Sequence, residues 1–268
     1  MKLNQLAFTA IKKQTCAIGV LRTTVEQFCS NPAESSFRIL GTGFLIAKRL
    51  VITNRHVLTA LKAYCDKESL PLDRRYVAFV HPTGDAVAQI FREIERTAIS
   101  IEDGFDVGLI VFKGDAADTL NLTVPAAIPS NHQSEVGDPI AVYGYAFGEV
   151  LLKRQVDDRQ VIYRFGPILQ QGFISAVAPY DHSGVIDRFL LDVRTAKGMS
   201  GGPVFDCQTG TIIGIHNAGI DDTVAFAIPL HRQMIGEMIK MADAGPQPGE
   251  VLVKHTHATR TDASQRGA

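Results

Sequence analysis

Short apolar runs recur along the whole chain, and most have the composition of β-strands. They are rich in Val, Ile, Leu and Phe and are bounded by Gly, Pro, Asn and Asp. A polar, Pro-containing stretch at residues 113–129 divides the runs into two sets. The first set predicts strands at residues 16–23, 37–47, 50–53, 76–81, 86–101 and 107–112, and the second at residues 139–144, 166–177, 189–193, 202–205, 211–216 and 224–228.

Each set holds about six strands, as two packed antiparallel barrels require. We therefore predict an all-β fold of two packed six-stranded antiparallel β-barrels, at about residues 15–115 and 130–230. Helical periodicity is scarce. It occurs at residues 56–65, at the extreme N-terminus, and at 230–244, where Met234, Met238 and Ile239 form one face. Residues 245–268 turn polar and predict a disordered tail.

Composition and charge narrow the classes of function. The chain has 268 residues, of which 46% are hydrophobic and 21% charged, as in an ordinary soluble protein. The net charge of −1 gives no indication of a nucleic-acid or membrane partner. No apolar run reaches the roughly 18 residues of a spanning helix, and no signal peptide is recognisable, so we expect a cytoplasmic protein. The oligomeric state is left open.

The four cysteines (Cys16, Cys29, Cys65 and Cys207) lie far apart and form no CxxC pair. In a reducing compartment this spacing favours free thiols over disulfides or a metal site. The His, Asp and Cys content contains no ligand cluster, so we expect neither a metal nor another cofactor.

Three segments carry candidate chemistry. In residues 41–57, a strand, a turn and a second strand lead to His56 at the start of a short helix, where backbone on both sides holds it as a general base must be held. In residues 105–112, Asp106 opens an otherwise apolar strand. Such a carboxylate can accept a hydrogen bond from an imidazole and fix its tautomer. Asp103, in the same loop, is the alternative acid.

The third segment, KGMSGGPVF at residues 197–205, surrounds Ser200 with glycines. These glycines permit a tight loop whose amides point at one spot, and they leave room for a substrate backbone. We take the amides of Gly198 and Ser200 as the donors to an oxyanion. His56, Asp106 and Ser200 follow one another at separations of 50 and 94 residues, and this joint occurrence predicts a nucleophile, base and acid triad.

The same segments resemble those of the trypsin-like serine peptidases, and most closely the bacterial branch with the HtrA-type enzymes. The matching motifs are TNRHV at residues 53–57, DVGLI at 106–110, GMSGGP at 198–203, GIHNA at 214–218 and FAIP at 226–229. The resemblance spans about residues 15–240. It implies a peptidase domain at residues 1–244 with a C-terminal helix, and a protein or peptide as substrate.

Two departures from that pattern bear on regulation. No PDZ-length segment follows Pro229 in this sequence. Met199 precedes the nucleophile where secreted digestive relatives carry an Asp that pairs with a freshly cut N-terminus. Met199 cannot form that ion pair, so we do not expect activation by N-terminal clipping.

Two alternatives remain beside the endopeptidase. The sequence GMSGG also fits the G-x-S-x-G of α/β-hydrolases, but a triad of Ser200, Asp221 or Asp222, and His231 would leave about ten residues between acid and base. It would also leave His56 and Asp106 unexplained. The second alternative is a catalytically silent trypsin-like scaffold that acts as a binding module.

Specificity rests on the segment that follows the nucleophile. His216 and Asn217 lie in a G-x-H element that resembles that of glutamyl endopeptidases, in which the His contacts an acidic or amide side chain before the cut. Thr195, five residues before Ser200, matches a Thr of the same pocket. The resemblance therefore implies a preference for Glu or Gln, whereas a histidine that merely packs in a strand would imply none.

Overall fold

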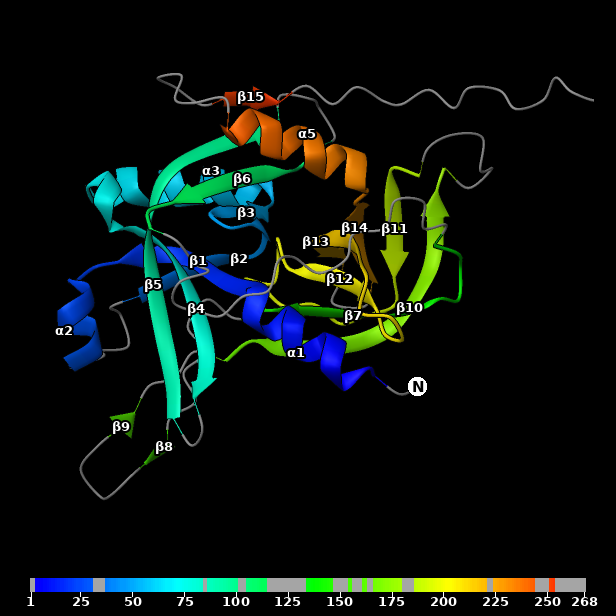
Figure 1. Ribbon diagram of the computed structural model, residues 1–268, viewed down its shortest axis with the longest axis horizontal. Helices are drawn as coiled ribbons and strands as arrows, with labels where there is room; N and C mark the ends of the chain where they lie inside the picture. The colour runs from blue at the N-terminus through cyan, green and yellow to red at the C-terminus, as the bar shows by residue number, and fades with distance from the viewer. Residues whose placement is uncertain are drawn as a thin grey trace, which may run out of the picture.

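The computed structural model describes most of the two predicted barrels. The described residues are 3–30, 37–83, 86–100, 105–114, 134–146, 154–155, 161–162, 166–179, 186–220, 224–243 and 251–253. Figure 1 shows the chain as two groups of strands side by side, with a helix near each end of the chain lying against them.

The first barrel consists of β1 (Thr15–Leu21), β2 (Phe37–Ala47), β3 (Leu50–Thr53), β4 (Arg75–Thr83), β5 (Ala86–Ser100) and β6 (Gly108–Phe112). The order is β4–β1–β2–β3–β6, and β5 pairs antiparallel with both β4 and β6, which closes the ring. Closure leaves no free strand edge around the ring. Val57, Leu58, Leu61 and Cys65 from helix α3 (Arg55–Lys67) pack into this barrel's core.

The environment of strand β1 explains why its sequence is a continuous apolar run and does not alternate between apolar and polar residues. Cys16, Ile18 and Val20 belong to the core of the first barrel. Ala17 and Leu21 belong to a second cluster on the opposite face of the strand. Both faces are buried, so every position of β1 favours an apolar or small residue.

The second barrel consists of β7 (Pro139–Gly144), β10 (Ile168–Ala178), β11 (Arg188–Leu191), β12 (Pro203–Asp206), β13 (Ile212–Ile220) and β14 (Val224–Pro229). These strands close in the order β10–β11–β14–β13–β12–β7. The prediction of two six-stranded antiparallel barrels is therefore confirmed, and so are all the predicted strands, with ends that differ by a few residues. The remaining short elements are α2 (Val25–Ser30), a 3-10 turn η1 (Leu72–Arg74), and the hairpin of β8 (Arg154–Gln155) and β9 (Val161–Ile162).

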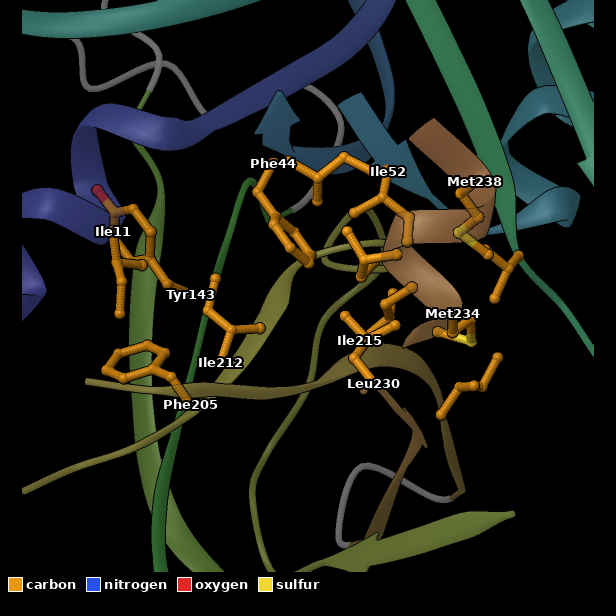
Figure 2. Close-up of a cluster of buried hydrophobic side chains, with 14 of the residues drawn as sticks. Ile11, Phe44, Ile52, Tyr143, Phe205, Ile212, Ile215, Leu230, Met234 and Met238 are labelled. Atoms are coloured by element: carbon orange, nitrogen blue, oxygen red, sulfur yellow. The ribbon is translucent and has the colours of Figure 1, made fainter. Parts of the chain in front are cut away.

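A shared hydrophobic cluster joins the two barrels. In Figure 2, Phe44 and Ile52 of the first barrel face Ile215 of the second. Met234 and Met238 complete the same cluster from α5 (Arg232–Asp243), the predicted C-terminal helix. Apolar area buried between the barrels stabilises their relative placement, on which any site between them depends.

The N-terminal helix α1 (Gln5–Gln14) also crosses between the barrels. It leads directly into β1, yet it packs on the second barrel: the ring of Phe8 lies edge-on to Tyr143 at 5.2 Å, and the Asn4 N–H donates to the Cys207 carbonyl at 2.9 Å. Asn4 also caps the helix, because its side chain accepts from the Ala7 N–H at 3.2 Å.

The segment predicted as a disordered tail contains one described strand, β15 (Val251–Val253). It pairs parallel with β5 at Ala98–Ser100. The rest of residues 245–268 lies outside the described residues, as does most of the predicted divider at 113–129. Cys16, Cys65 and Cys207 are free and buried, as expected, whereas the side chain of Cys29 lies outside the description.

Candidate active site

The predicted base His56 and the predicted acid Asp106 lie side by side in the first barrel. His56 is the second residue of α3, and Asp106 precedes β6. The ring Nδ1 of His56 lies 2.5 Å from Asp106 Oδ2, and the His56 backbone N–H donates to Asp106 Oδ1 at 2.9 Å. Both carboxylate oxygens of Asp106 are therefore engaged by one residue, which fixes the orientation of the imidazole.

The protonation state of Asp106 follows from these contacts. Burial alone would raise the pKa of its carboxyl group. The hydrogen bonds from the ring and backbone of His56, together with the charges of His56 and Arg55, outweigh burial and lower that pKa below its ordinary value. An ionised Asp106 can only accept, so Nδ1 of His56 carries the proton of this hydrogen bond, and in the neutral ring Nε2 is an acceptor. The His56 side chain is 46% exposed and that of Asp106 only 16%, so the imidazole is more open to solvent than the carboxylate.

Asn54 is a site residue that the sequence analysis missed. It stands at the N-cap position of α3, but its side chain does not cap the helix. Instead it is fully buried, and its amide donates to the Asp106 carbonyl at 2.9 Å. Asn54 thus holds the backbone of Asp106 while His56 holds its side chain. A polar residue between the end of β3 and the start of α3 was the available signal.

The glycines after Ser200 are required by the protein's own backbone. Gly201 has φ +87°, and a Cβ built there would lie 2.0 Å from the carbonyl oxygen of Thr42 in β2. A Cβ at Gly202 would lie 2.5 Å from the carbonyl oxygen of Tyr143 in β7. The space that was predicted to admit a substrate backbone is filled by β2 and β7, so the glycines let the loop sit tightly between the barrels.

The two predicted oxyanion donors are unpaired. Gly198 has φ +100°, in the left-handed region that favours glycine. The neighbouring Met199 N–H donates to the backbone carbonyl of Ala196 at 3.1 Å. The Gly201 N–H donates to the backbone carbonyl of His216 at 2.8 Å. Within the described part of the chain, the N–H groups of Gly198 and Ser200 have no hydrogen-bond partner. They are therefore free to bind an acceptor from outside.

The hydroxyl of Ser200 donates to the backbone carbonyl of Asn217 at 2.8 Å. Asn217 occupies a β-bulge in β13, where the pairing with β14 shifts register between His216 and Ala218. The bulge turns this carbonyl toward the serine. The N–H of Thr42 donates to the Ser200 carbonyl, and the Thr53 hydroxyl donates to the Thr42 carbonyl at 2.7 Å. Ser200 is thereby tied to the strand that leads into His56.

His216 and Thr195 lie next to the nucleophile loop with different exposure. His216 is only 2% exposed, and neither ring nitrogen has a hydrogen-bond partner among the described residues. Burial first, and the charge of His56 second, lower its pKa to about 4; the Met199 backbone opposes this shift without reaching hydrogen-bonding geometry. Thr195 is half-buried and lies against β13. A Cβ built at Gly219 of that strand would lie 2.3 Å from the Thr195 hydroxyl oxygen.

Of the other sequence candidates, only His231 lies within the described residues. Asp103, the alternative acid, lies outside the described residues, and so do Asp221 and Asp222 of the esterase alternative. His231 stands before α5, where the Met234 N–H donates to its ring at 3.3 Å. The closed barrels lack the strand-to-helix arrangement that the α/β-hydrolase alternative needs.

Two closed six-stranded barrels, joined along a common core, define a trypsin-like double-barrel protein. The family model of the trypsin-like peptidase domain matches residues 41–215, and the chain belongs to this family.

Individual relatives agree with this membership. The chain is 26% identical over 185 residues to the human peroxisomal leader peptide-processing protease. The match covers 69% of this chain but only 26% of that protein.

Among solved structures, the chain is similar to Rv3671c from Mycobacterium tuberculosis in two forms. For the inactive form the TM-score is 0.54 at 18% identity, covering 91% of this chain and 94% of the other. For the active protease form the TM-score is 0.53 at 16% identity, and the match covers 94% of this chain and 92% of the other. At such identity the likeness shows a common fold. Among the described helices, none combines the length and apolarity needed to cross a bilayer.

Proposed function

We propose that the protein is a serine endopeptidase in which His56, Asp106 and Ser200 form the catalytic triad. The observation that carries the proposal is the pair of His56 and Asp106, held by two hydrogen bonds, with the imidazole nearly half exposed. Family membership supports a peptidase, and the amides of Gly198 and Ser200, which are unpaired among the described residues, support an acyl-transfer site.

The proposed mechanism assigns one task to each group. Ser200 leaves the Asn217 carbonyl and turns its hydroxyl toward His56. Its oxygen attacks the scissile carbonyl while Nε2 of His56 takes the hydroxyl proton, and the amides of Gly198 and Ser200 bind the oxyanion. His56 then delivers the proton to the leaving amine. Water hydrolyses the acyl-enzyme by the same route, and Asp106 stabilises the imidazolium in both halves.

Regulation by a newly cut N-terminus is not part of the proposal. Met199 is fully buried and packs in the core of the second barrel with Val193 and Val204. An apolar side chain in that position offers no partner to an ammonium group.

A fluorophosphonate probe tests the proposed nucleophile. It phosphonylates a serine only where a base and an oxyanion site activate the hydroxyl. We expect covalent labelling of the wild-type protein at Ser200, and none in Ser200→Ala or His56→Ala. An unlabelled wild type that is folded by circular dichroism would favour the silent scaffold and contradict the proposal.

The finer proposal concerns the residue before the scissile bond, for which we propose Glu or Gln. A buried imidazole with two unpartnered nitrogens is costly, and an acidic or amide side chain would satisfy one of them. The hydroxyl of Thr195 and the backbone of Asn217 would complete the contacts. Because burial holds His216 neutral at pH 7, it would act as a hydrogen-bond donor rather than as a charge.

A peptide series that varies only this residue tests the preference. We expect kcat/KM for Glu and Gln to exceed that for Val and Ala by more than tenfold, and His216→Ala to remove the difference. A preference for Val or Ala that His216→Ala leaves unchanged would dispose of the acidic pocket while leaving the triad intact.

A further inference from the structure

Thr42 connects the first barrel to the loop that carries Ser200. It is fully buried in β2. Its N–H donates to the Ser200 carbonyl at 2.8 Å, and its hydroxyl donates to the Gly198 carbonyl at 2.8 Å. The same hydroxyl accepts the Tyr145 N–H at 2.9 Å. A hydroxyl has one proton, so with that N–H as its donor its own proton is committed to Gly198.

These bonds fix the peptide groups on both sides of an oxyanion amide. The Gly198–Met199 peptide is held at its carbonyl by Thr42 and at its N–H by Ala196. In the Ser200–Gly201 peptide, the carbonyl accepts from the Thr42 N–H, and the N–H donates to the backbone carbonyl of His216. Between them lies the peptide that supplies the Ser200 N–H. Because peptide groups are planar, two anchored neighbours leave this one little freedom to rotate.

Packing keeps the Thr42 hydroxyl in place. A Cβ at Gly144 would lie 3.0 Å from that oxygen and 3.3 Å from Cα of Met199. The side chain therefore fills a narrow space between β7 and the nucleophile loop. Neither the pattern of apolar residues nor any motif singled out Thr42. The available signal was a polar residue between two glycines in a largely apolar strand.

We propose that Thr42 is a positioning residue for the oxyanion site, and this rests on the proposed function. Its hydroxyl orients the Gly198–Met199 peptide so that the amides of Gly198 and Ser200 converge on one point. Without that hydroxyl the Gly198 carbonyl loses its donor, the peptide rotates, and the free amides diverge. Thr42 touches neither substrate nor reacting atoms, so its effect reaches the reaction through the loop alone.

The test compares substitutions of Thr42 that keep or remove the donor. Thr42→Val preserves shape without the hydroxyl, and we expect kcat to fall by about 10–100-fold, less than the 10²–10³-fold typical of losing an oxyanion donor outright. Thr42→Ser keeps the donor and should stay within about threefold of wild type. Thr15→Val is the matched control, because Thr15 is a buried threonine of β1 whose hydroxyl donates to the Ile11 carbonyl at 2.8 Å. It should lose stability but keep kcat.

Three readouts separate positioning from general damage. The rate of fluorophosphonate labelling should fall with kcat in Thr42→Val. The apparent pKa of the pH–rate profile should not move, because the His56–Asp106 pair is untouched. Peptide affinity, measured in a Ser200→Ala background, should not change either. If Thr42→Val does not fold, Thr42→Cys replaces it as a near-isosteric weak donor, with an expected rate between those of Ser and Val.

Each outcome decides the matter. Loss in Val or Cys with recovery in Ser supports the proposal. The proposal is overturned if Thr42→Val or Thr42→Cys keeps the wild-type kcat, if Thr42→Ser loses as much activity, or if the pH profile shifts. None of these results would contradict the triad. A folded wild type that Ser200-directed probes do not label overturns the proposed function, and the role of Thr42 with it.

Discussion

His56 and Asp106 share two hydrogen bonds but differ in their access to solvent, and this difference suits the tasks proposed for them. The carboxylate is shielded and held by His56, and Asn54 holds the Asp106 backbone carbonyl, whereas nearly half of the imidazole surface is open. A shielded acceptor keeps its geometry, and an open base can exchange protons with a substrate. The joint occurrence of the three segments in the order His, Asp and Ser predicted this pair, because each segment adjoins a recognisable strand. Asn54 escaped notice because a polar residue before a helix is usually read as its cap.

The assignment of the acid is testable at this scale. Asp106→Asn removes the acceptor for the Nδ1 proton of His56 and presents the wrong tautomer, so we expect kcat to fall by about 10⁴-fold with the fold intact. Asp103→Asn serves as the control and should keep kcat near that of the wild type. Steady-state kinetics on one peptide decides between them. Loss in Asp103→Asn with retention in Asp106→Asn would show that the acid is misassigned.

His216 predicts an acid-labile fold. Its pKa is about 4 when folded and close to 6.5 when unfolded, so between these values the unfolded chain binds more protons. The contribution of neutral His216 to the free energy of unfolding is therefore present above pH 6.5 and is lost as the pH falls toward 4. We expect a contribution on the order of 2 kcal/mol to be lost between pH 7 and pH 5. Urea unfolding at both pH values measures it, and His216→Gln should lose distinctly less than wild type. Equal losses in the two proteins would refute the assignment.

At the scale of elements, the predicted strands matched because burial on one or both faces leaves a strong apolar pattern. The largest discrepancy is β13, which was expected to end at residue 216 and continues to Ile220. The bulge at Asn217 breaks the alternation there, and a bulge leaves no simple periodic signal. The hairpin of β8 and β9 was missed because two-residue strands carry no periodicity. The role of Gly201 and Gly202 was misread, since which backbone approaches a glycine depends on tertiary packing.

Two glycines of the second half give opposite predictions for the same substitution. A Cβ at Gly236 in α5 would meet nothing within 4 Å, so Gly236→Ala should raise the free energy of unfolding by about 0.5–1 kcal/mol through helix propensity. Gly201→Ala should destabilise severely, because its Cβ would overlap the Thr42 carbonyl. Denaturant unfolding compares both with the wild type. Destabilisation by Gly236→Ala would contradict the open space around this position.

For the whole molecule, the two terminal helices matter because each links the barrels. Helix α1 precedes the first barrel but packs on Tyr143 and Phe205 of the second. Helix α5 follows the second barrel, and its methionines join a cluster that includes Phe44 and Ile52 of the first. The barrels therefore share one hydrophobic cluster beside their own cores and hold His56 and Ser200 in a common frame. Sequence periodicity predicted both helices but not their partners, since a 3.6-residue pattern reports a buried face without naming what covers it.

A shared core predicts cooperative unfolding. Met234→Ala removes a side chain that is only 3% exposed within this cluster, and we expect a loss of about 2–5 kcal/mol in the free energy of unfolding. Both barrels should still unfold in one transition, followed by circular dichroism and tyrosine fluorescence together. Exposed Leu6 of α1 provides the control, because Leu6→Ala should cost little. Two separate transitions in the wild type would show that the barrels are independent.

The central claim is that this molecule hydrolyses peptide bonds through Ser200, and peptide-library cleavage tests it most directly. The purified wild type and Ser200→Ala are incubated with the same library, and the new N-termini are identified and timed by mass spectrometry. We predict cleavage by the wild type and a fall in kcat of about 10⁴–10⁶-fold in Ser200→Ala, with the two proteins equally folded. Equal cleavage by both proteins, or no cleavage by a folded wild type, would contradict the account.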